Sequence, residues 1–85
     1  MKIAVGQRWQ YVDNSSNFIG QIMLVEPKIS KIVVKVVHVY KDSLGQKSLG
    51  TVFDSACLQT TESTGVFSDK GNHWSWTYLT NQDAP

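Results

Sequence analysis

The stretch Lys31-Ile-Val-Val-Lys-Val-Val-His-Val-Tyr-Lys41 decides the fold of this 85-residue chain. It is dense in β-branched residues, which lose rotamer freedom in a helix and pack well on a pleated surface. Successive side chains of a strand point to opposite faces. Even positions carry mainly apolar residues together with His38, whereas odd positions mix Val with Lys. The stretch therefore predicts a long central strand, with His38 on its more apolar face as a core or rim residue.

Strand signals recur on both sides of this stretch. Four further strands are expected, over residues 7–12, 17–26, 48–54 and 74–79. The last of them alternates large aromatic side chains with hydroxyl side chains, which is the period-two pattern of a strand. Residues 55–59 fit either one helical turn or a continued strand. Residues 60–72 are rich in Thr, Ser, Gly and Asn and predict a long loop.

The fold class follows from the number and length of these strands. No segment shows the apolar spacing of an amphipathic helix. Five antiparallel strands in so short a chain cannot cover both faces of a flat sheet, so they must curl on themselves. We therefore expect an all-β fold, a single small five-stranded and partly open barrel. It would occupy residues 1–80 as one domain and leave residues 81–85 as a polar C-terminal tail.

Charge and cysteine content narrow the classes of partner and compartment. Eight Lys and Arg against seven Asp and Glu give a net charge of +1, which excludes both a strongly electrostatic DNA binder and an acidic nucleic-acid mimic. One cysteine cannot form an intramolecular disulfide, so the cytoplasm is the expected compartment. No apolar stretch is long enough for a signal peptide or a membrane span, so we expect no membrane partner.

Residue types that carry catalysis are few. Cys57 could act as a nucleophile beside His38 or His73, with Asp54 orienting the imidazole, but no family signature surrounds it. The competing interpretation is a buried cysteine that packs as a small apolar residue. The spacing of these residues fits no short metal-ligand pair. We therefore expect a non-enzymatic protein without a catalytic residue, a metal or a cofactor.

The most unusual feature is an aromatic stripe in the last expected strand. Trp74, Trp76 and Tyr78 form it, and Trp9 and Tyr11 of the first strand would join it across the barrel seam. If the rings face inward they form the core, and if they face outward they form a binding platform. A small barrel can hardly enclose three Trp residues, so we expect some rings inside and others at a pocket or an interface. These five aromatic residues are the candidate binding residues for a protein or ligand.

A basic face is the second candidate site. Lys31, Lys35 and Lys41 share the odd face of the central strand. Beside exposed rings they could follow a single-stranded nucleic acid backbone. They could also simply solvate the outer face and block edge-to-edge aggregation, and the net charge of +1 favours this second interpretation.

Both chain ends suggest a family. Val5-Gly-Gln-Arg-Trp9 and the segment Ile19-Gly-Gln-Ile22 resemble the start of small SH3-like barrels of the Tudor and KOW kind. The chain also resembles short phage-encoded proteins that open in this way and close with Trp-x-Tyr-Leu, here Trp76-Thr-Tyr-Leu79. The first resemblance implies an SH3-like barrel. The second implies a takeover or counter-defence factor that binds and blocks a host component.

Together these observations predict a non-enzymatic binding protein, encoded by a phage and acting in the host cytoplasm. It would inhibit or redirect a bacterial defence, transcription or replication component by protein–protein binding, with aromatic anchors and lysines at the rim. A barrel that binds single-stranded nucleic acid is one alternative, and an oligomeric sponge for a small nucleotide is another. Homo-oligomers are plausible for each, because an open barrel leaves edge strands exposed.

Overall fold

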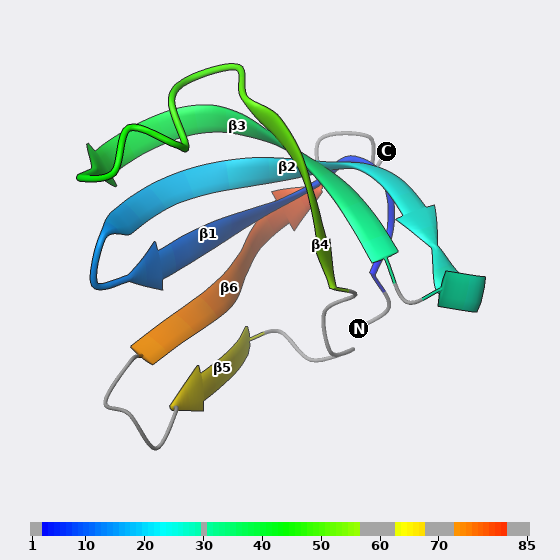
Figure 1. Ribbon diagram of the computed structural model, residues 1–85. Coiled ribbons are helices and arrows are strands. Elements are labelled where there is room, and N and C mark those ends of the chain that lie inside the picture. Colours follow the sequence, from blue (N-terminus) through cyan, green and yellow to red (C-terminus); the bar gives the residue numbers. More distant parts are fainter. Residues whose placement is uncertain (1–2, 30, 57–62, 68–72, 82–85) are drawn as a thin grey trace.

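A computed structural model describes residues 3–29, 31–56, 63–67 and 73–81 of the chain (Figure 1). Its elements in chain order are β1 (Gln7–Asp13), β2 (Ser16–Glu26), the 3₁₀ helix η1 (Pro27–Ile29), β3 (Lys31–Asp42), β4 (Val52–Ala56), β5 (Ser63–Phe67) and β6 (His73–Asn81). The strands form one sheet in the order β4-β3-β2-β1-β6-β5. Every neighbouring pair is antiparallel. In the part of the chain that the structure describes, no helix is long and apolar enough to cross a membrane.

The predicted all-β fold is confirmed, and the sheet is curved and partly open. β4 and β5 stand at the two ends of the strand order, so the barrel does not close between them. Figure 1 shows the long strands β2 and β3 bending over the inner side of the sheet. Strand curvature of this kind follows from the native twist of sheets and from local bulges. The bulges are also what shapes the candidate site below.

Two predicted boundaries are corrected. A loop is predicted for residues 60–72, because Ser, Thr and Gly favour turns. β5 instead forms a sixth strand within this range, since pairing with the edge of β6 overrides that local preference. β4 starts at Val52 instead of residue 48. Gly50 has a φ of 87°, and the N–H of Thr51 donates to the carbonyl of Ser48 (3.0 Å), so this segment turns before the strand begins. Within residues 55–59, Ser55 and Ala56 continue β4, and the remainder lies outside the described residues.

The core lies on the inner, concave face of the sheet. Among the residues that the structure describes, eight apolar side chains are buried there: Ile3, Trp9, Phe18, Ile22, Ile32, Val34, Val36 and Trp76. Each fully buried aliphatic or aromatic side chain contributes roughly 1.5–3 kcal/mol. The Phe18 and Trp76 rings meet edge to face with centroids 6.0 Å apart, which joins β2 to β6 across β1. The even positions of β3 up to Val36 thus face the core, as the alternation predicted.

Gly20 allows β2 and β3 to approach closely at the centre of this core. A Cβ atom at this position would collide with Cγ1 of Val34 and would lie 3.5 Å from the Phe18 ring. Gly20 also adjoins a shift of register between β2 and β3. The absence of a side chain at this position therefore lets β3 bend across β2 without displacing the core.

Candidate functional site

In the described part of the sheet, register shifts leave four residues unmatched opposite a neighbouring strand. Val37 and Tyr40 are unmatched in β3 opposite β2, Met23 is unmatched in β2 opposite β3, and Leu79 is unmatched in β6 opposite β1. Each is the extra residue of a β-bulge. Bulges re-aim side chains and occur often beside active and binding sites.

The bulge at Val37 reverses the alternation of β3. His38 pairs with Ile19 on the outer face and is exposed, whereas Val39 takes the inner position opposite Phe18 and packs against the core. The prediction that His38 lies on the apolar face is therefore wrong. Its physical cause is the one extra residue, because the side-chain period of a strand is two and an insertion of one moves every later side chain to the other face.

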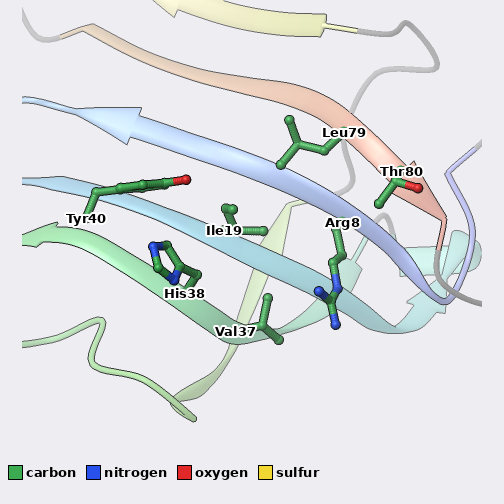
Figure 2. Close-up of a pocket in the computed structure, with 7 residues that line it drawn as sticks. All are labelled: Arg8, Ile19, Val37, His38, Tyr40, Leu79 and Thr80. Carbon is green, nitrogen blue, oxygen red and sulfur yellow. The ribbon is translucent and has the colours of Figure 1, made fainter.

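A depression of about 400 Å³ lies on the outer face, where the bulges converge (Figure 2). We call it the outer depression, and its lining residues come from β1, β2, β3 and β6: Arg8, Ile19, Val37, His38, Tyr40, Leu79 and Thr80. Three of the four unmatched residues are among them, Val37, Tyr40 and Leu79. The local irregularities of the sheet are thus concentrated on one place on its surface.

Its apolar part is a floor with an exposed rim. Ile19 and Val37 are half-buried and form the floor between Tyr40 at one end and Arg8 at the other (Figure 2). Tyr40 is 58% exposed and Leu79 is 43% exposed. Covering this exposed apolar surface would stabilise a complex by a free energy of about 25 cal/mol for each Å² buried. Their grouping around a concave surface is typical of a binding site.

The polar part of the outer depression is basic, and some of its hydrogen-bond donors are unpaired among the described residues. The Nε of Arg8 donates to Oε1 of Gln21 (3.1 Å), which orients the guanidinium. The terminal amino groups of Arg8 form no hydrogen bond or ion pair with any described residue. His38 packs edge to face on Tyr40, with ring centroids 4.5 Å apart, so these two rings form one wall. The described lining includes hydroxyl groups but no carboxylate.

The aromatic stripe lies on the inner side of the sheet. Trp9 and Trp76 are 0% and 4% exposed and belong to the core. Tyr11, Trp74 and Tyr78 are half-buried and pack against that core. The expected contact between first and last strands is confirmed, since Trp9 pairs with Tyr78 and Tyr11 pairs with Trp76. A binding role for the three half-buried rings stays a prediction, whereas the two buried indoles have almost no surface to offer a partner.

Polar contacts of these rings hold the β1–β2 turn. The Tyr11 hydroxyl donates to Oδ2 of Asp13 (2.6 Å), and Oδ1 of Asp13 accepts from the N–H groups of Ser15 and Ser16 (both 2.7 Å). Burial, and then the hydrogen bond and charge of Asp13, raise the pKa of Tyr11. Burial alone would raise the pKa of Asp13, but the hydrogen bonds from Tyr11, Ser15 and Ser16 and the charge of Lys47 outweigh it and lower that pKa. This network closes a turn beside the core.

The predicted basic face is present but largely occupied. Nζ of Lys31 lies 3.1 Å from Oδ2 of Asp54, and Nζ of Lys41 donates to the carbonyl of Asn14 (3.1 Å). Lys35 is exposed and stands opposite Gln21 on the outer face. Exposed pairs of this kind contribute about 0–1 kcal/mol and are easily exchanged. Binding of nucleic acid by these lysines stays a prediction.

The residues considered for catalysis are not assembled in the described part of the chain. Asp54 pairs with Lys31, and His38 contacts Tyr40. Cys57 and the side chain of His73 lie outside the described residues. Within those described, no group of three or more His, Cys, Asp and Glu is placed to hold a metal ion.

The outer depression does not follow from the sequence pattern, because strict alternation leaves no place for bulges. One signal is present: His38 stands in an otherwise apolar row of even positions, and an extra residue at Val37 explains it. Comparison with family models, with curated proteins and with solved structures finds no match to this chain.

Proposed function

We propose that this protein is a non-enzymatic binding protein that recognises a partner protein through the outer depression. One observation carries the proposal: three bulges present Val37, Tyr40 and Leu79 at a single concave place on the surface. Tyr and Arg are among the residue types that most often dominate protein interfaces, and both line the outer depression.

The surroundings of the outer depression support a protein partner over a small ligand. The site is broad and its walls are exposed, whereas small-molecule sites enclose most of the ligand surface. Polar side chains surround it on the same face. Gln10 donates to Asn17 (2.9 Å) beside Ile19, and Gln21 accepts from Arg8. An apolar centre with a polar rim is the usual anatomy of a protein interface.

The proposed action is occlusion of the partner. The resemblance of both chain ends to phage-encoded proteins supports a role in a host cell, where the chain inhibits or redirects a defence, transcription or replication component. Such an action needs affinity and a blocking surface and no chemical step. Most of its binding energy would come from a few anchors near the centre, with the rim excluding water.

A pull-down from bacterial lysate with matched variants tests this function. Leu79→Ser should abolish recovery of a specific partner, because it removes one wall of the outer depression. Met23→Ser is the control, since Met23 is also the extra residue of a bulge and is 44% exposed against 43% for Leu79, but does not line the outer depression. Failure to retain any specific protein, or equal loss with both variants, would overturn the proposal.

A second candidate function rests on the same face. Lys35 and Lys41 stand opposite outer-face residues of β2, and the exposed Tyr40 ring lies between them in sequence. A cationic track with a stacking ring is the minimal equipment for binding a single strand. Fluorescence anisotropy with a labelled oligothymidylate at two salt concentrations tests it, and salt-independent or absent binding rejects it.

A further inference from the structure

The chemistry of the outer depression specifies part of its partner. Arg8 is held in place at one end by its hydrogen bond to Gln21, and that bond uses only one of its donors. A guanidinium has five N–H donors in a planar fork, and the fork matches a carboxylate or a phosphate through two parallel hydrogen bonds. The free side of the Arg8 guanidinium therefore suits an anionic group.

The middle of the outer depression suits an apolar side chain. Ile19 and Val37 form the floor and Leu79 forms a wall, and none of them offers a hydrogen bond from its side chain. A volume of about 400 Å³ lies near the lower end of the range for ligand sites, which is about 300–1,000 Å³. It holds the side chains of a short segment, with the Tyr40 ring available to stack on them.

Charge favours a carboxylate over a phosphate chain. The described lining has no Asp or Glu to repel an anion, and its one fixed cation is Arg8, with no lysine among the lining residues to follow a polyanion. The net charge of the chain is only +1. One fixed guanidinium beside an apolar floor therefore matches a single acidic residue next to a bulky apolar residue.

We propose that the outer depression binds a partner segment in which an Asp or Glu adjoins a large apolar residue. The carboxylate binds the terminal amino groups of Arg8, and the apolar side chain lies on Ile19 and Val37 against Leu79. This proposal rests on the proposed function and names the chemical class of the recognised segment.

Blocked peptides test the proposal by NMR titration of the ¹⁵N-labelled protein. Acetyl-Leu-Glu-Leu-amide should shift the backbone resonances of Arg8, Ile19, Val37 and Leu79. Acetyl-Leu-Gln-Leu-amide should bind at least about tenfold more weakly, because it lacks the charge-assisted hydrogen bonds. Equal affinity for the two peptides would overturn the proposal. So would tighter binding of inorganic phosphate or of an oligothymidylate to the same residues.

Variants separate the guanidinium from general charge. Arg8→Gln should remove the preference for the Glu peptide, and Arg8→Lys should restore only part of it, because an ammonium lacks the fork. Lys28→Gln is the control, since Lys28 is an exposed cation that does not line the outer depression. An equal loss with Lys28→Gln would show that only general charge matters. Thermal unfolding of each variant shows whether it is folded.

The pull-down distinguishes the two proposals. If the partner is lost with Leu79→Ser and retained with Arg8→Gln, the binding function stands and the acidic segment is rejected. If both variants lose it and Met23→Ser retains it, both proposals are supported.

Discussion

Replacing Gly20 with alanine tests the close approach of β2 and β3 on which the curvature of the sheet depends. The added methyl group would collide with Cγ1 of Val34, a side chain with 0% exposure. Overpacking a core costs about 1–3 kcal/mol. Gly20 is not among the glycines with positive φ, so alanine fits its backbone and gains about 0.4–1 kcal/mol through the unfolded state. We expect a net loss of up to about 2.6 kcal/mol in the free energy of unfolding.

The assay is urea unfolding followed by tryptophan fluorescence, because Trp9 and Trp76 are buried in the core. A loss of this size lowers Tm by about 4–8 °C per kcal/mol in a domain of this length. A double-mutant cycle with Val34→Ala identifies the cause. That substitution removes Cγ1, so in its background Gly20→Ala should keep only the gain of about 0.4–1 kcal/mol through the unfolded state, and the coupling energy should equal the overpacking cost of about 1–3 kcal/mol.

Ile32→Val provides the control background. Ile32 is also fully buried on the inner face of β3, but none of its atoms is among the three that lie nearest to a methyl group placed on Gly20. Gly20→Ala and Ile32→Val should therefore be additive within about 0.5 kcal/mol. Additivity with Val34→Ala as well, or a stabilising Gly20→Ala in the wild-type background, would refute the close approach as the reason for this glycine.

Two further predictions concern the β1–β2 turn and the aromatic stripe. Because the pKa of Asp13 is lowered in the folded state, its contribution to stability is present above about pH 4 and is lost as pH falls through the folded-state pKa. Because the pKa of Tyr11 is raised, its contribution is lost as pH rises beyond about 10. Tyr11→Phe should weaken both dependences, which urea midpoints across this pH range measure. Iodide should quench the fluorescence of the half-buried Trp74 and spare that of Trp9 and Trp76, so Trp74→Phe should remove most of the quenchable emission. Strong quenching that persists in this variant would contradict the burial of Trp9 and Trp76.

Local pattern was sufficient for most strands. β-branched residues, aromatic alternation and the lack of helical spacing predicted strands that coincide with β1, β2, β3 and β6 within a few residues. Residues 60–72 misled the prediction, because β5 has a turn-like composition and pairs only because β6 offers an edge. Pairing partners distant in sequence are invisible to local propensity.

The candidate site shows the same division more sharply. Alternation places His38 and Tyr40 on one face of the central strand, but nothing local indicates that they meet Arg8 of the first strand. They come together because β1, β2, β3 and β6 lie side by side and because bulges turn Val37, Tyr40 and Leu79 toward one place. The stripe that the sequence did emphasise supplies two buried tryptophans to the core instead.

The sequence by itself determined that this protein is an all-β chain with its aromatic residues on one face of its first and last strands, since β-branching and period-two alternation act within a few residues. Only the tertiary structure decided which side chains come together at the outer depression. A strand keeps its alternation until one extra residue is accommodated opposite a neighbour, and that accommodation depends on the partner strand. At Val37 such an extra residue moved His38 from the expected core face to the outer depression.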